Sequence, residues 1–313
     1  ILSGLVGSEM CIRDRNIHLA RVTYLPIPDN TVRLANLQSG AVEFAERMEP
    51  DDMKPIQRSR NLRAVAVDEL GYQGITINTG NGERANTPFG RDARLRRAFE
   101  LAIDRAAINQ VVYEGMYVPT RQPFPPASPF HVRDFAPPAR DVARAQALLR
   151  EAGVTLPVIV ELTVPNNPDL RQAGEVIQAM VKEAGFDLRL RAMEFASSLQ
   201  AAARGDFETY LVGWSGRTDP DGNIYSFSRS GGGQNDGRYA NPEVDRLLDE
   251  ARTELDLAKR RELYARATRI AFGDDVSRIY LWHRKNIMGH SARLTGYRPI
   301  ADGMVRLQGM RLQ

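Results

Sequence analysis

The order of hydrophobic and polar positions along the chain predicts an α/β protein in which helices and strands take turns. Apolar residues recur at helical spacing between Asp92 and about Tyr113, and an earlier helix carrying Val32, Leu34, Leu37 and Val42 is expected, with a break at Gly40. Further helices are expected at Ala139–Ala152, Asp169–Ala184, Leu199–Arg204, from the Asn241-Pro242 cap to about Glu254, and at Ala258–Phe272.

Runs of alternating or β-branched apolar residues lie between these helices and predict the strands. They are Val22–Leu25, Leu62–Asp68, Gly74–Asn78, Val158–Val164, Phe186–Arg191, Thr209–Trp214 and Ile279–His283. Strands separated by helices favour parallel pairing through right-handed crossovers. The seven prolines between Pro119 and Pro138 predict an irregular crossing segment, and the residues from Ser215 to Tyr239 a loop.

Length and composition indicate a globular protein of two lobes. A chain of 313 residues exceeds what one hydrophobic core usually supports, and 42% of its residues are hydrophobic. No apolar run is long enough to cross a bilayer. The 42 basic residues nearly balance the 39 acidic ones and form no block, which argues against nucleic-acid binding.

The first fifteen residues do not match a secretory signal, because they lack a basic start and a small-residue cleavage site. Residues Ser8 to Arg15 resemble translated adapter sequence, so we expect residues 1–15 to be non-native and the natural N-terminus to be missing. Cys11 is the single cysteine, which excludes a disulfide within the chain.

No constellation for catalysis, metal binding or a cofactor is found in the sequence. The four histidines have no metal-ligand spacing, and neither a nucleophile elbow nor a glycine-rich phosphate loop is present. Asp219, Asp221 and Asn223 alternate like the start of a calcium loop, but Ile224 stands where that loop needs glycine. We therefore expect no enzyme activity, no metal and no cofactor.

The segment from Gly213 to Asn223 is the strongest candidate site. It follows a predicted parallel strand, where α/β sheets bind ligands, and it combines an aromatic ring, a guanidinium and two carboxylates. The proposed ligand-binding residues here are Gly213, Trp214, Ser215, Arg217, Asp219, Asp221 and Asn223. The structural alternative is that Asp219 and Asp221 only form turns and that Arg217 pairs with one of them.

Several motifs, in order, resemble the peptide-type (dipeptide and oligopeptide, family 5) extracellular solute-binding proteins of ABC transporters. The motifs are Ile27-Pro28-Asp29-Asn30-Thr31, Ala102-Ile103-Asp104-Arg105, Gly213-Trp214-Ser215-Gly216 with Asp219-Pro220-Asp221, and Asn241-Pro242-Glu243-Val244-Asp245. The resemblance runs from about Tyr24 to Leu307. It implies the two-lobe α/β fold of class II periplasmic binding proteins, with the first lobe incomplete.

The resemblance also implies domain boundaries. Residues 16–79 would be the remnant of lobe I, residues 80–282 lobe II, and residues 283–313 the return to lobe I. Asn78, Thr79 and His283 would then lie at the hinge crossings.

In peptide-binding members of this family an Asp three residues after the tryptophan holds the ligand's ammonium group. Arg217 occupies that position here, which favours an anionic group instead. Two alternatives stay open: Asp219 or Asp221 reaches the ammonium group, or Arg217 turns away into an ion pair. Arg171 aligns with the region that binds the ligand carboxylate, although it also fits an ordinary solvated helix arginine.

The expected function is solute capture for an ABC importer, with a peptide or small-molecule ligand and permease subunits as partners. The expected location is the periplasm, or the cell exterior as a lipoprotein whose anchor precedes this chain, and the full-length protein would be monomeric. A ligand-sensing domain of a transcriptional regulator and, more weakly, a hydrolase on the same scaffold are the alternatives.

Overall fold

The computed structural model describes residues 16–313, which form two compact units. Unit 1 consists of residues 16–68 and 285–313, and unit 2 of residues 69–284. Two long strands, β2 (Leu62–Ile77) and β7 (Arg278–Ser291), contribute residues to both units. The first boundary lies before Asn78 and Thr79, so these two predicted hinge residues are inside unit 2. The second boundary directly follows Arg284, next to the predicted crossing at His283.

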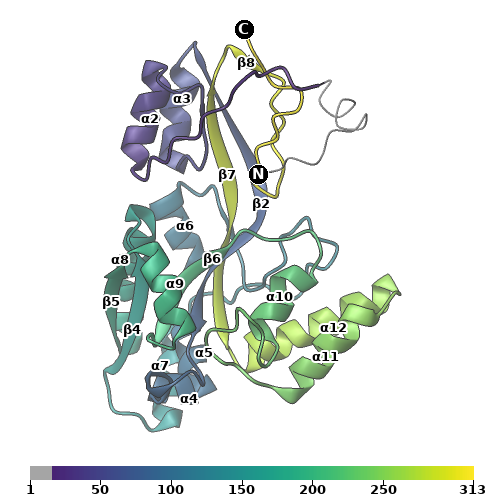
Figure 1. The fold of residues 1–313 in the computed structure, drawn as a ribbon. Helices are drawn as coiled ribbons and strands as arrows, with labels where there is room; N and C mark the ends of the chain where they lie inside the picture. The colour runs from purple at the N-terminus through teal and green to yellow at the C-terminus, as the bar shows by residue number, and fades with distance from the viewer. Residues whose placement is uncertain (1–15) are drawn as a thin grey trace. The chain divides into compact units, whose positions relative to one another are not determined.

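Unit 1 contains two helices, and unit 2 contains the other described α-helices (Figure 1). Those of unit 1 are α2 (Asn30–Ser39) and α3 (Met53–Arg58). Those of unit 2 are α4 (Pro88–Arg91), α5 (Ala93–Ala102), α6 (Arg105–Tyr113), α7 (Val142–Ala152), α8 (Pro168–Ala184), α9 (Phe195–Ala203), α10 (Asp221–Ser228), α11 (Pro242–Thr253) and α12 (Leu257–Thr268).

The sheet of unit 2 is mixed, with the order β5, β4, β6, β2, β7. Its remaining strands are β4 (Val158–Pro165), β5 (Phe186–Met193) and β6 (Thr209–Trp214). Strand β4 pairs in parallel with both β5 and β6, as the alternation of helices and strands predicts. Strand β6 pairs with β2 in the antiparallel direction, which the sequence pattern did not predict.

Each face of this sheet carries its own hydrophobic core, because successive side chains of a strand point to opposite faces. Ile279 and Leu281 of β7 belong to a cluster with α5, α6, α7 and α8, whereas Tyr280 joins a cluster formed mainly by α11 and α12. Figure 1 shows α11 and α12 side by side as a hairpin, separate from the helices around β4 and β5. The candidate loop belongs to the second face, since Trp214 packs against that cluster.

Helix ends agree with the capping residues in the sequence. Asp29 accepts a hydrogen bond from the Val32 amide at the start of α2, and Gly40 ends that helix with a φ of 76°. Asn241 caps α11 in the same way, by accepting from the amides of Glu243 and Val244. These local signals explain why the predicted start of α11 and the end of α2 are confirmed.

Unit 1 is built around the ends of β2 and β7. A short strand, β1 (Phe44–Ala45), pairs with β7 at His290 and Gly289. Leu37 of α2 and Ile56 of α3 are buried close to Gly289, where a Cβ atom would lie 2.5 Å from a Leu37 methyl group. The absence of a side chain at Gly289 therefore lets both helices pack on β7. The other short strands are β3 (Val118–Pro119, in unit 2), β8 (Leu294–Thr295) and β9 (Arg311–Leu312).

Several predicted elements were wrong in extent or type. Val22–Leu25 is not a strand, and the helix from Asp92 to Tyr113 is divided into α5 and α6 because Asp104 caps a new helix by accepting from the Ala107 amide. The two strands predicted within residues 62–78 are one strand, β2, and β7 extends to Ser291. The predicted loop 215–239 contains helix α10.

Candidate functional site

The loop after β6 lies at the carboxyl end of two neighbouring parallel strands, β4 and β6. Its backbone passes very close to β2: a Cβ atom at Gly71 would lie 2.2 Å from the Trp214 carbonyl oxygen. Gly216, with a φ of 79°, comes equally close to the backbone of Leu70. Glycine is needed at both positions, so the path of the loop is fixed by backbone packing within unit 2.

Asn223 holds this loop together from the first turns of α10. Its Oδ1 accepts hydrogen bonds from the Arg217 amide at 2.7 Å and from the Trp214 indole Nε1 at 3.2 Å. Its Nδ2 donates to the Arg217 carbonyl oxygen at 2.7 Å. Asn223 is 2% exposed, and a buried side chain with three such bonds fixes both the indole and residue 217.

Arg217 lies over the indole of Trp214, with Cζ 4.3 Å from the ring centroid. Its Nη1 donates to the Ser215 hydroxyl at 3.1 Å and to the Gly216 carbonyl at 2.6 Å. No carboxylate of residues 16–313 forms an ion pair with Arg217. The alternative in which Arg217 turns away into an ion pair is therefore not seen among the described residues.

Both acidic residues of the loop form ion pairs with the helical hairpin. Asp219 Oδ1 lies 3.1 Å from Nη2 of Arg260 on α12, and Asp221 Oδ1 lies 3.1 Å from Nε of Arg252 on α11. Asp219 also accepts from the Asp221 amide at 3.0 Å. These two carboxylates attach the loop to α11 and α12, as turn-formers with ion-pair partners.

Burial changes the acidity of one of these carboxylates. It raises the pKa of Asp221 above the ordinary 3.8, and the negative charge of Asp219 acts in the same direction, while Arg252 and Arg260 oppose it. Asp221 therefore takes up a proton at a higher pH than an ordinary aspartate does.

Trp214 contacts a group of aromatic and cationic side chains that the sequence pattern did not reveal. Phe227 of α10 meets the indole edge-to-face with ring centroids 5.1 Å apart, and Arg278 lies 5.1 Å over the Phe227 ring. Arg278 is buried, and its Nη1 donates to the Tyr72 hydroxyl at 3.3 Å. One sequence signal could have pointed to Arg278, because it is a charged residue at the start of the apolar run Ile279–Trp282.

Arg171 lies apart from this group. It is in the first turns of α8, and its exposed side chain pairs with Glu175 one helical turn later, at 3.3 Å. Among the described residues, none of its hydrogen bonds or ion pairs joins the Trp214 loop.

Of the predicted hinge residues, Asn78 is buried and donates to carbonyls of Asn81, Gly205 and Phe207, and His283 Nδ1 bonds the Gly71 carbonyl. The described part of the chain brings together no group of three or more His, Cys, Asp or Glu residues suited to a metal ion.

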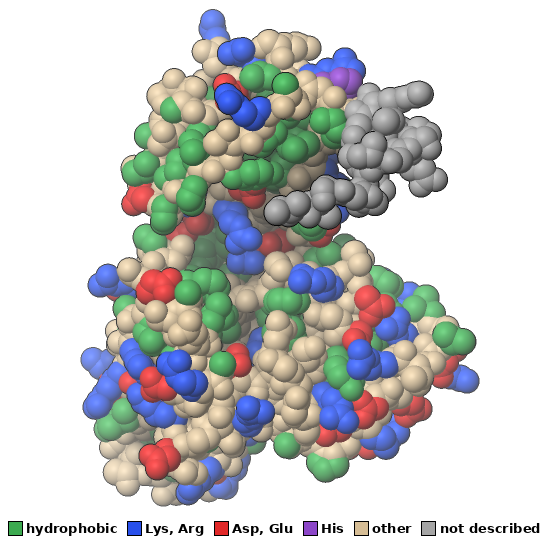
Figure 2. Space-filling model, in the orientation of Figure 1, with side chains coloured by type: hydrophobic (Ala, Val, Ile, Leu, Met, Phe, Trp, Pro, Cys, Tyr) green, Lys and Arg blue, Asp and Glu red, His purple; other side chains and the backbone are tan. Residues whose placement is uncertain are grey.

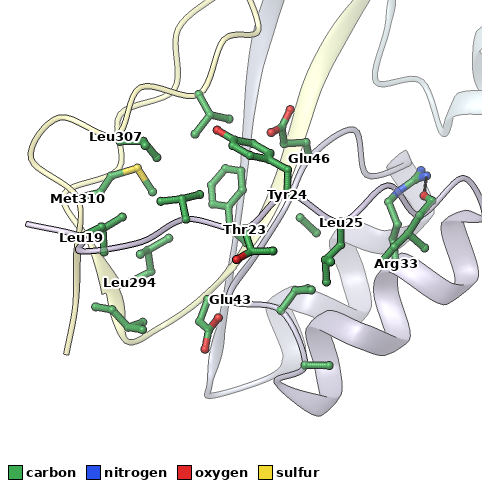
Figure 3. Close-up of a pocket in the computed structure, with 18 of the residues that line it drawn as sticks. Leu19, Thr23, Tyr24, Leu25, Arg33, Glu43, Glu46, Leu294, Leu307 and Met310 are labelled. Atoms are coloured by element: carbon green, nitrogen blue, oxygen red, sulfur yellow. Dashed lines mark hydrogen bonds between the residues drawn. The ribbon is translucent and has the colours of Figure 1, made fainter. Parts of the chain in front are cut away.

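Unit 1 contains a separate cavity of about 630 Å³ (Figure 3). Its walls are mostly apolar and include Leu19, Leu25, Leu294, Leu307 and Met310. Arg33 also lines this cavity. Its Nη atoms donate to the carbonyls of Ile27, Pro28 and Arg47 and to the Asn30 side chain. Figure 2 shows apolar side chains gathered on this unit's surface, and Tyr24 and Leu25 are 67% and 58% exposed. These features fit an uncovered apolar core face better than a site for a polar solute.

Comparison with known proteins gives the chain its family. A sequence model of the bacterial extracellular solute-binding proteins, family 5 (middle part), matches residues 13–236. The chain belongs to this family. Its relatives include the dipeptide-binding protein of Escherichia coli, 26% identical over 279 residues, which are 84% of this chain and 51% of that protein. The glutathione-binding protein GsiB of Pectobacterium atrosepticum is also 26% identical, over 91% of this chain and 56% of its own length.

Similar solved structures share the fold. The periplasmic binding protein DppA of Helicobacter pylori, in complex with the peptide STSA, superposes with a TM-score of 0.81 at 23% identity, covering 91% of this chain and 56% of that one. The predicted fold, the class II periplasmic-binding-protein type, is confirmed. This chain spans about half the length of the relatives that it matches.

The family description names these proteins as bacterial extracellular solute-binding proteins. The described helices are all too short or too polar to traverse a lipid bilayer.

Proposed function

We propose that this chain is the larger part of the solute-binding component of an ABC importer, which captures peptides or a related small polar solute, anionic solutes included. Membership of family 5 supports the transport role, and the loop from Gly213 to Asn223 supports the site. Permease subunits are the partners in this proposal, and the periplasm or cell surface is the location.

The loop suits the capture of a polar solute because its donors are fixed before any ligand arrives. Asn223 holds the backbone of Arg217 on both sides, and the close approach of Gly71 and Gly216 leaves the loop little freedom. A preorganised site loses less entropy when it binds a ligand. Closing of the two lobes on the solute, which would then present both lobes to the permease, is part of the proposal.

The test is a thermal-shift screen of the complete natural protein. The panel contains free-amine peptides, N-blocked peptides, glutathione-like conjugates and sugar phosphates. A bound solute stabilises the folded state by mass action, by about 2.7 kcal/mol at one hundred times its dissociation constant. We expect at least one class to raise the melting temperature in a saturable way. If no class of solute changes the melting temperature, a solute-binding role is contradicted. Turnover of a peptide would favour the alternative that the protein is a hydrolase.

A further inference from the structure

The ligand-facing charge of the loop can be counted from its ion pairs. Arg252 neutralises Asp221, and Arg260 neutralises Asp219, at nitrogen–oxygen distances of 3.1 Å each. Three guanidiniums, those of Arg217, Arg252 and Arg260, thus meet two carboxylates, and one positive charge is left. It resides on Arg217, which has no ion-pair partner among residues 16–313 and is exposed to solvent.

The orientation of this guanidinium leaves one edge available. Nη1 is occupied by the Ser215 hydroxyl and the Gly216 carbonyl, whereas Nε and Nη2 form no hydrogen bond with the described residues. The indole supports the guanidinium plane from below at 4.3 Å. The stem has room because residue 222 is glycine, where a Cβ atom would lie 2.8 Å from Cβ and Cγ of Arg217. Two parallel N–H groups on a supported plane match the two oxygens of a carboxylate.

We propose that Arg217 binds a carboxylate group of the solute through its Nε and Nη2 edge, and that Asn223 is the residue that positions it. This inference rests on the proposed function, and it names the class of solute: a small acid without a free ammonium group at this point. An ammonium group is excluded here by like-charge repulsion, since neither nearby carboxylate is free to compensate it. Asn223 acts through Arg217 and Trp214 without touching the solute.

The experiment compares three probes of nearly equal size on the complete natural protein by isothermal titration calorimetry. They are an N-acetyl dipeptide, its C-terminal amide, and the free-amine dipeptide amide, which carry negative, zero and positive charge. We expect the acid to bind at least about tenfold more tightly than the neutral amide, because a hydrogen bond between charged groups is stronger than one between neutral groups. The cationic probe should bind most weakly.

Variants separate the roles of the residues. Arg217→Gln should remove the preference for the acid over the neutral amide, Arg217→Lys should fall between, and Arg217→Glu should reverse the preference between acid and cation. Asn223→Ala should lower the affinity for the acid more than that for the amide, a difference that loss of folding alone would not produce. Arg144→Gln is the matched control, because Arg144 is an exposed α7 arginine paired with Glu151.

The outcomes distinguish the inference from the function on which it rests. If all three probes bind equally, or if Arg217→Glu leaves the order unchanged, the carboxylate assignment is wrong while solute binding stands. If none of the probes binds and the thermal-shift screen is also negative, the proposed function falls and the assignment falls with it.

Discussion

At the residue scale, the proposed site consists of one arginine without an ion-pair partner among the described residues, held by a buried asparagine. The sequence alone placed Trp214, Arg217, Ser215 and Asn223 in one loop, because they are adjacent in the chain and follow a strand that the pattern predicts correctly. It could not assign the partners of Asp219 and Asp221, since Arg260 and Arg252 come from helices more than thirty residues further along. Long-range ion pairs leave no local pattern.

The acidity of Asp221 gives a pH dependence with a definite sign. Because its folded-state pKa is raised, Asp221 becomes neutral, as the pH falls, before an ordinary aspartate with a pKa of 3.8 does. Protonation of Asp221 removes one negative charge from the loop, which leaves Arg252 without this charged partner and makes the surroundings of Arg217 more positive. Stability from this residue also increases on acidification, because the cost of burying its charge disappears.

We therefore expect the affinity for a small N-acylated sulfonate, whose own charge is constant, to increase as the pH is lowered from 7 towards 4. Calorimetry at several pH values measures this, and Asp221→Asn should remove the dependence. Asp302→Asn is the control, because hydrogen bonding to Arg306 holds the pKa of Asp302 at about 2, below the range used. An identical slope in Asp221→Asn would show that another group is responsible.

At the scale of elements, sequence patterns predicted those whose ends are set locally and missed those set by distant contacts. Helix α2 ends at a left-handed glycine and α11 begins at an Asn-Pro cap, both visible in the chain. Helix α10 was missed because Pro220 and Gly222 read as turn residues, yet Asn223 and Ile224 are buried there by packing against the rest of unit 2. Strand β2 contains Gly71 and Gly74 in its interior. Neighbouring backbones approach these two positions so closely that a side chain would not fit, so the glycines do not end the strand.

The helical hairpin that anchors the loop offers a matched pair of substitutions. Leu247 of α11 is fully buried in the core that α11 and α12 share, whereas Leu255, in the turn between these helices, is 97% exposed. Leu247→Ala should lower the free energy of unfolding by about 2–5 kcal/mol through lost burial and the cavity left behind. Leu255→Ala should change it by less than about 0.5 kcal/mol. Denaturant titration of the complete protein measures both, and equal effects would contradict this packing.

At the scale of the whole molecule, the two units differ in how well their apolar surfaces are covered. Unit 2 buries large hydrophobic clusters on both faces of its sheet, whereas unit 1 exposes Val22, Tyr24 and Leu25 beside an apolar cavity. The exposed apolar side chains of unit 1 include those of residues 22, 24 and 25, at the start of the described chain. The domain limits 79/80 and 282/283 stay a prediction, and the compact units divide at 68/69 and 284/285.

When the 313-residue chain is expressed by itself, it should therefore aggregate. Size-exclusion chromatography with light scattering would show this as mass well above 35.0 kDa. Replacing Tyr24 and Leu25 by serine should reduce the effect, while the same double change at the exposed pair Leu255 and Leu257 should reduce it less, because those residues lie outside the lining of the unit 1 cavity. A monomeric chain with one cooperative melting transition would contradict this reading of unit 1.

The central claim is that a solute binds at the Trp214 loop, and the most direct measurement is tryptophan fluorescence of the complete natural protein during titration with a stabilising solute. Trp214 is partly exposed under Arg217, whereas Trp282 is buried in unit 2, so a nearby ligand alters Trp214 emission selectively. The prediction is a saturable change in emission that disappears in Trp214→Phe and persists in Trp282→Phe. A solute that binds equally well and gives the same spectral change in Trp214→Phe would place the site elsewhere.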